Sequence, residues 1–99
     1  MPQYKFTEQA EHDLGGIIDF TIQQWGQSQA LKYVDGLEEL LGSLAGSPLL
    51  GTKKDELFKG LMSFPYVSHV VFYVENADGI TVIRILHKRM DSKKHLSGM

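Results

Sequence analysis

The 99-residue sequence contains no cysteine, and this absence excludes several kinds of chemistry at once. The chain has no disulfide to stabilise a small core, and no thiolate to act as a nucleophile or a zinc ligand. No apolar run approaches the roughly 20 residues needed to cross a bilayer, and the start, Met-Pro-Gln-Tyr-Lys-Phe, has no basic segment followed by an apolar one. We therefore expect a cytoplasmic protein that does not enter a membrane.

The length and composition are those of one small globular domain. A chain of 99 residues buries about two-thirds of the surface that its unfolded form exposes, which is sufficient for one modest core. Hydrophobic residues make up 42% and charged residues 22% of the chain, so disorder throughout is not expected. We predict a single domain over residues 1–99.

The charge is distributed unevenly along the chain. The formal net charge is −2, which argues against a general nucleic-acid coat. Residues 1–45 hold two lysines against seven carboxylates, a balance of −5, whereas residues 84–99 hold five cations against Asp91 alone, a balance of +4. The second half of the chain therefore ends in a short, concentrated basic segment.

The first half predicts a short strand followed by a helical hairpin. The alternation of residues 4–6 is typical of a strand, and Thr7 can cap the helix that follows. Apolar residues then recur every three or four positions as far as Gly26, and again from about Ser28 to Gly46 and Pro48. Two amphipathic helices joined by so short a connection must turn back on each other.

The second half predicts an antiparallel meander. Residues 46–54 combine turn formers with a lysine pair and are interpreted as an exposed loop. Strands are expected over residues 57–64, 66–74 and 80–86, with Gly79 supplying the positive φ of a tight hairpin. The predicted fold is α+β, in the order β-α-α-β-β-β, with the helical hairpin packed on an antiparallel sheet.

The sequence resembles the ParE toxins of the RelE/ParE toxin–antitoxin superfamily from about residue 4 to residue 95. The residues that carry the resemblance are Thr7, Ala10, Asp13, Leu14, Ile17, Ile18, Trp25-Gly26, Gln29-Ala30, Tyr33, Leu44-Ala45, Pro48, Gly60 to Phe64, Val71 to Tyr73, Ile83 to His87, Arg89 and Asp91. The resemblance implies a bacterial growth-arrest toxin, of the kind linked to plasmid stabilization, that inhibits DNA gyrase and so blocks replication. It also implies neutralisation by a cognate antitoxin.

The resemblance has one departure and leaves two alternatives. ParE-like sequences commonly carry a basic residue where this chain has Met62, so a function tied to that position does not follow. A degenerate toxin that only binds its antitoxin is one alternative. The other is a nuclease like RelE, which cuts mRNA on the ribosome.

A metal-free nuclease needs a base, a cation beside the phosphate and an acid for the leaving oxygen. The residues available for these roles are Lys53, Lys54, Tyr66, Tyr73, Arg84, His87 and Arg89. Met62 removes a cation from the middle strand, where we expect such a site to face solvent. We therefore assign no catalytic residue and favour action by binding.

Several residues have both a structural and a functional interpretation. Arg84 lies in an apolar strand, where it either pairs with a helix carboxylate such as Asp13 or Asp19 or belongs to a binding site. Alternation places it on the face of Val82 and Leu86 unless a bulge intervenes. Trp25 is interpreted as a core anchor or a hairpin-corner residue rather than a stacking platform.

Metal binding is not expected. His87, Asp91 and His95 are spaced four apart, but positions eight apart on a helix are about 12 Å distant, too far to share one ion. His12 and His69 are interpreted as isolated surface or packing histidines. No cofactor is expected either.

The basic end is the predicted target-binding region. Its residues are Arg84, His87, Lys88, Arg89, Lys93 and Lys94. The antitoxin is expected to lay an amphipathic helix or strand on apolar surface and to pair acidic residues with this end. Nucleic acid is expected only indirectly, through the gyrase–DNA complex or an operator-bound antitoxin. We expect removal of residues 91–99 to weaken toxicity more than the fold.

Overall fold

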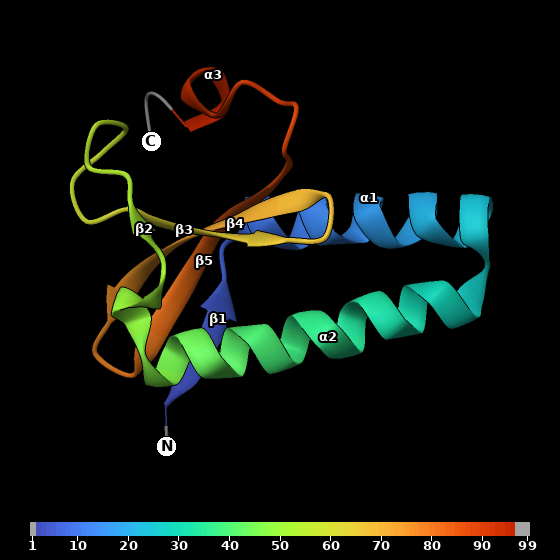
Figure 1. The fold of residues 1–99 in the computed structure, drawn as a ribbon, viewed down its shortest axis with the longest axis horizontal. Coiled ribbons are helices and arrows are strands. Elements are labelled where there is room, and N and C mark those ends of the chain that lie inside the picture. The colour runs from blue at the N-terminus through green and yellow to red at the C-terminus, as the bar shows by residue number, and fades with distance from the viewer. Residues whose placement is uncertain (1, 97–99) are drawn as a thin grey trace.

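A computed structural model describes residues 2–96 and confirms the α+β class. Figure 1 shows two long helices packed beside a sheet, with a short third helix near the C-terminus. The elements in chain order are β1 (Gln3–Phe6), α1 (Glu8–Trp25), α2 (Gln27–Gly46), the 3-10 turn η1 (Pro48–Leu50), β2 (Thr52–Lys53), β3 (Met62–Tyr66), β4 (His69–Asn76), β5 (Gly79–His87) and α3 (Ser92–Leu96). No helix among the described residues is long and apolar enough to cross a membrane.

The sheet is mixed rather than wholly antiparallel. Its strand order is β1-β5-β4-β3-β2, and β2 to β5 pair antiparallel whereas β1 pairs parallel with β5. The helical hairpin separates β1 from the meander, so no tight turn forces β1 to run antiparallel. Gly79 has the expected positive φ, +153°, and a Cβ there would collide with the backbone oxygen of Gln3. A glycine at this position therefore lets β1 approach the hairpin closely.

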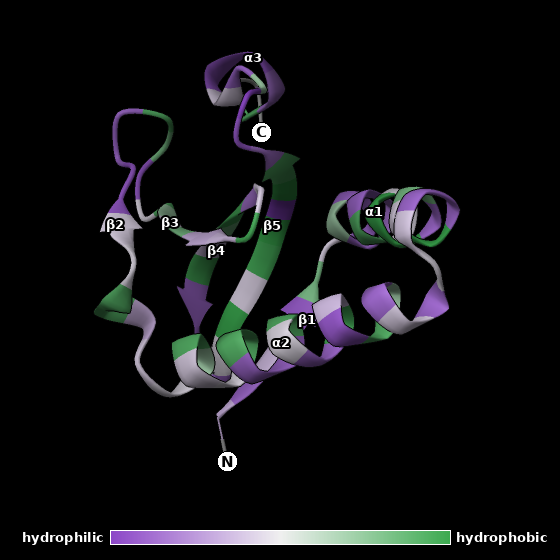
Figure 2. Cartoon of the chain, turned by 45° about the vertical axis from the view of Figure 1, so that its right-hand side comes forward, coloured by the Kyte–Doolittle hydropathy of each residue, from purple (hydrophilic) through white to green (hydrophobic). Residues whose placement is uncertain are grey.

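The helical hairpin forms as predicted. The Thr7 hydroxyl accepts a hydrogen bond from the amide of Ala10 at 3.1 Å, and Gly26, at φ +89°, joins the two helices. In Figure 2 the hydrophobic residues of α2 lie on its side facing β5. The main core between hairpin and sheet consists of Ala10, Tyr33, Leu37, Leu41, Leu44, Ala45, Met62, Val71, Tyr73, Ile80, Val82 and Ile85.

A second, smaller core covers the other face of the sheet. Leu61, Phe72, Leu86 and Leu96 form this cluster. The tail is docked on this core as far as Leu96, because the Leu96 side chain is only 1% exposed. Asp91 caps α3 by accepting a hydrogen bond from the amide of Lys93 at 3.1 Å. The remaining tail residues, 97–99, lie outside the described residues.

Two of the predicted strands have different boundaries. The strand expected over residues 57–64 begins only at Met62, because Leu57 and Phe58 lie in turns and pack against the second core. The strand expected over residues 66–74 is interrupted by a turn at Val67 and Ser68, where Val67 has φ +54°. The loop predicted over residues 46–54 also contains η1 and the two-residue strand β2.

Candidate functional site

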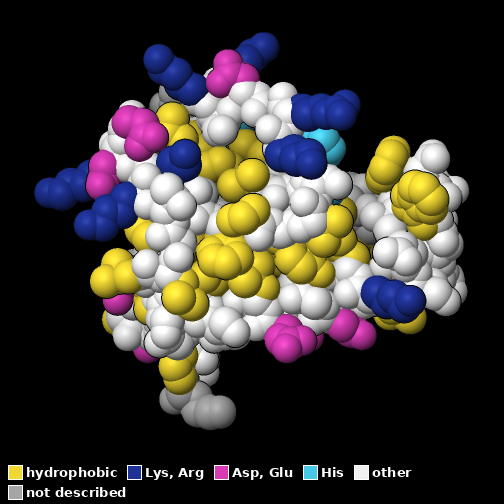
Figure 3. Space-filling model, viewed as in Figure 1, with side chains coloured by type: hydrophobic (Ala, Val, Ile, Leu, Met, Phe, Trp, Pro, Cys, Tyr) yellow, Lys and Arg dark blue, Asp and Glu magenta, His cyan; other side chains and the backbone are white. Residues whose placement is uncertain are grey.

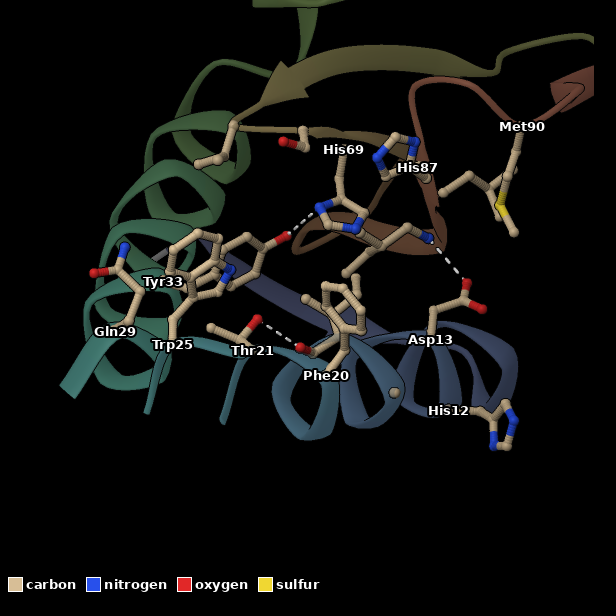
Figure 4. Close-up of a pocket in the computed structure, with 16 residues that line it drawn as sticks. His12, Asp13, Phe20, Thr21, Trp25, Gln29, Tyr33, His69, His87 and Met90 are labelled. Carbon is tan, nitrogen blue, oxygen red and sulfur yellow. Dashed lines mark hydrogen bonds between the residues drawn. The ribbon is translucent and has the colours of Figure 1, made fainter. Parts of the chain in front are cut away.

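An apolar groove lies between α1 and the adjoining ends of β4 and β5. Its volume is about 570 Å³, and Figure 4 shows the side chains around it. Four exposed apolar side chains line it: Trp25 (74% exposed), Val67 (72%), Phe20 (61%) and Met90 (47%). Of the two structural interpretations of Trp25, the hairpin-corner one is confirmed, because Trp25 is the last residue of α1 before Gly26. The core-anchor interpretation was wrong, because the helical hairpin extends past the sheet (Figure 1) and the Trp25 side chain is exposed.

A tyrosine and two histidines form the polar part of the groove. The hydroxyl of Tyr33 and Nδ1 of His69 are 3.2 Å apart, and the rings of His69 and His87 meet edge to face with centroids 5.5 Å apart. Burial, followed by the neighbouring His87, lowers the pKa of His69. His69 is therefore not the isolated histidine that the sequence suggested, since strand pairing places it directly opposite His87. The amide of Arg89 donates to Nδ1 of His87 at 3.1 Å.

Arg84 forms a structural ion pair with Asp13 beside the groove. Its Nε and Nη2 donate to the two Asp13 carboxylate oxygens at 2.8 and 3.0 Å, and this bonding raises the pKa of Arg84. Asp13 also accepts the Ile85 amide at 3.0 Å. The carboxylate thus covers the edge of β5 beyond the end of β1. Of the two interpretations of Arg84, the structure supports pairing.

A β-bulge in β5 changes the face of the sheet to which the residues after it point. Tyr73 pairs with Val82 and Phe72 pairs with Arg84, so Ile83 is an extra residue on β5. Val82 consequently packs in the main core and Leu86 in the second core, on opposite faces of the sheet. Simple alternation, which places both on one face, fails at this point.

The two phenols considered for a nuclease take part in structural hydrogen bonds. Tyr73 is fully buried, and its hydroxyl donates to the Pro48 carbonyl at 2.8 Å. The Tyr66 hydroxyl donates to the carbonyl of Tyr33 at 2.6 Å. Lys53 lies on β2, which is the edge strand at the far end of the sheet from the β1–β5 pair. The two phenols therefore serve as structural hydrogen-bond donors, and Lys53 is far along the sheet from the residues of β5.

Met62 does not face solvent. Its side chain is 5% exposed and packs in the main core beneath the helices. Met62 lies opposite Tyr73, and side chains of paired residues point to the same face of a sheet. The expectation that Met62 removes a cation from an exposed site was therefore wrong.

The structure divides the predicted target-binding residues into three groups. Arg84 is paired, His87 lines the groove, and the other four, Lys88, Arg89, Lys93 and Lys94, are exposed. Two further lysines from the β2–β3 loop lie at the same end, and sequence reasoning missed them because they are distant in the chain. We call this set the basic surface: Lys54, Lys59, Lys88, Arg89, Lys93 and Lys94. Figure 3 shows Lys and Arg side chains gathered over α3 and this loop.

The potential metal ligands of the C-terminal segment lie apart from one another in the chain's local structure. Among residues 2–96, no three His, Asp or Glu side chains converge as a metal site. His87 ends β5, Asp91 precedes α3, and His95 lies within that short helix. The three residues thus belong to different local structures rather than to one helix.

Comparisons with known proteins agree with the fold and the resemblance. The family model of the ParE toxin of the type II toxin–antitoxin system parDE matches residues 4–92. Toxin ParE of Escherichia coli is 38% identical over 100 residues, covering 98% of this chain and 95% of the relative. Toxin ParE1 of Mycobacterium tuberculosis is 34% identical over 95 residues, covering 95% and 97% respectively.

A solved structure shares the fold. The structure described as the chromosomal ParDE TA system from P. aeruginosa superposes with a TM-score of 0.70 at 22% identity, and the match covers 88% of this chain and 96% of that chain. The family match and the similar relatives both indicate a ParE toxin, and the shared fold is consistent with this. The chain belongs to the ParE toxins of type II toxin–antitoxin systems.

Proposed function

We propose that this toxin inhibits DNA gyrase by binding it, and that a cognate antitoxin neutralises the toxin. Membership of the ParE family supports both parts. We favour binding over catalysis because of one observation. Three of the residues considered for a nuclease, Tyr66, Tyr73 and Arg84, are held in structural hydrogen bonds. The proposed site of action is the cytoplasm, where gyrase and its DNA are found.

The two surfaces described above are proposed to have different roles. The basic surface faces the gyrase–DNA complex, as the charge of the C-terminal segment suggests. The apolar groove receives the antitoxin, because Trp25 and Phe20 expose large aromatic surfaces that an amphipathic partner segment would cover. Acidic residues of the antitoxin would lie beside Lys88 and Arg89, next to Met90 at the rim of the groove.

Two assays separate the proposal from its alternatives. Purified toxin is added to a gyrase supercoiling and cleavage assay and, in parallel, to an in-vitro translation reaction. We expect lost supercoiling or trapped cleavage complexes, with translation intact. Blocked translation with position-specific mRNA cuts would instead establish the RelE-like activity, and no effect in either assay would leave a toxin that only binds its antitoxin.

The antitoxin site is tested with a matched pair of variants. Trp25 and Leu31 are both large and exposed (74% and 65%), but only Trp25 lines the groove. Truncating a central aromatic anchor of an interface typically costs 2 kcal/mol or more, so we expect Trp25→Ala to weaken antitoxin binding about 30-fold or more. Leu31→Ala should change it less than threefold. Equal effects in isothermal titration calorimetry would place the antitoxin elsewhere.

A further inference from the structure

Six of the ten lysines and arginines gather at one end of the molecule, although they come from separate parts of the chain. They are the residues of the basic surface, from the β2–β3 loop, the turn after β5, and α3. The second core brings these segments together: Leu57, Phe58 and Leu61 of the loop pack with Leu96 of α3. Lys54 bonds through its amide to the carbonyl of Leu61 at 2.8 Å, which fixes it beside that core.

The acidic residues at this end do not neutralise it. Asp55, Glu56 and Asp91 are the carboxylates of these segments, so six cations against three leave a balance of +3. Asp55 accepts the Gly60 amide at 2.9 Å, and Asp91 caps α3, so two of the three also serve the local backbone. The rest of the chain holds four cations against nine carboxylates, a balance of −5. The molecule is therefore strongly polarised.

The chemistry of the basic surface favours nucleic acid over a protein partner. Stable protein interfaces have an apolar centre, but within residues 53–60 and 88–96 the only large apolar side chain exposed among the described residues is Met90, which belongs to the groove. Five of the six cations are lysines, which meet phosphates as flexible point charges without reading sequence. Such contacts supply most of non-specific DNA binding.

We propose that the basic surface binds the phosphate backbone of duplex DNA directly. The sequence suggested contact with nucleic acid only through a partner, whereas the assembled surface offers its own phosphate contacts. The acidic remainder of the molecule is repelled by DNA, so the toxin approaches with α3 and the β2–β3 loop foremost. This inference deepens the proposed function, since it places the toxin against the DNA held by gyrase.

Fluorescence anisotropy with a labelled 20-base-pair duplex, without gyrase, tests this inference across a salt series. With about four phosphate contacts, the association constant should fall about 50-fold between 50 and 150 mM salt. Replacing Lys93 and Lys94, which are both exposed on α3, by glutamine should reduce that fall to about sevenfold. The control replaces Lys5 and Lys32 by glutamine, which removes the same charge from outside the basic surface and should leave the salt dependence unchanged.

The outcomes separate this inference from the proposed function. It is overturned if no duplex binding occurs at 50 mM salt, if both double variants behave alike, or if an acidic polyglutamate peptide binds the same surface more tightly than DNA. Retained gyrase inhibition by a Lys93→Gln/Lys94→Gln variant that has lost DNA binding would overturn the placement of the toxin against the DNA held by gyrase, while leaving gyrase as the target. Conversely, DNA binding by a wild-type toxin that does not inhibit gyrase would support the site and refute the proposed target.

Discussion

Replacing Asp13 with alanine is expected to destabilise this toxin more than any other single change of a charged residue in α1. Asp13 links α1 to the edge of β5 through a side chain and a backbone amide of that strand. It accepts two hydrogen bonds from the Arg84 guanidinium and one from the Ile85 amide. Loss of the Asp13 carboxylate therefore leaves the Arg84 charge and the Ile85 amide without their partner. The side chains of Asp13 and Arg84 are only 12% and 17% exposed.

The magnitude follows from that one-sided loss. Breaking a buried pair by removing one partner costs about 3–5 kcal/mol, and the residual exposure of both side chains favours the lower end, about 3 kcal/mol. Arg84→Met should cost less, about 1–2 kcal/mol, because Asp13 still accepts the Ile85 amide. In the double variant no guanidinium is left unpaired, so the two losses should not add, and we expect a coupling of about 2 kcal/mol.

Urea unfolding followed by far-ultraviolet circular dichroism measures these differences. For a small domain, a loss of 3 kcal/mol lowers the urea midpoint by about 2 M. Asp19→Ala is the matched control, since Asp19 is an exposed carboxylate on the same helix, and it should change stability by less than about 0.5 kcal/mol. Additive losses in the double variant, or equal losses for Asp13 and Asp19, would refute this account. A charge swap is a poorer test, because an arginine in place of Asp13 cannot accept the Ile85 amide.

Two further predictions concern the tail and the groove. Leu96→Ala should lower the free energy of unfolding in urea by about 2–4 kcal/mol, because Leu96 completes the second core. The control, Lys93→Gln with Lys94→Gln, should change it by no more than about 0.5 kcal/mol. Comparable losses in the two variants would mean that α3 is not docked as described. The lowered pKa of His69 favours the neutral ring in the folded state. Since the unfolded histidine takes up its proton near pH 6.5, the free energy of unfolding should fall as pH drops through that region. His69→Gln should remove this contribution when midpoints at pH 7.5 and 5.5 are compared, and an unchanged pH dependence would assign it elsewhere.

Local signals in the sequence were sufficient for the helical hairpin and for the order of the main helices and strands along the chain. The Thr7 cap, the glycine at position 26 and the periodic apolar residues each act within a few positions, so the helix limits were predicted almost to the residue. The parallel pairing of β1 could not be predicted this way, because it depends on where the hairpin returns the chain. Nor could the bulge at Ile83, which arises from pairing with β4.

The candidate site was harder to predict because burial depends on tertiary position rather than residue type. Trp25 continues the apolar stripe of α1, yet it lies beyond the sheet and is exposed, whereas Leu96 follows three polar residues and is buried. The same limit applies to charge. Lys54 and Lys59 are about 30 to 40 positions from the other members of the basic surface, so only folding places them together. Removal of residues 91–99, which the sequence suggested as a test, would expose the second core as well as removing charge.

The groove and the basic surface meet in the four residues that follow Leu86. His87 and Met90 line the groove, whereas Lys88 and Arg89 belong to the basic surface. A partner that fills the groove and pairs acidic residues with Lys88 and Arg89 would therefore cover part of the proposed DNA contact without reaching α3. Neutralisation would then require no conformational change in the toxin, because competition for one shared turn is sufficient. It also follows that antitoxin binding and duplex binding should weaken each other by the same factor, since such coupling is reciprocal.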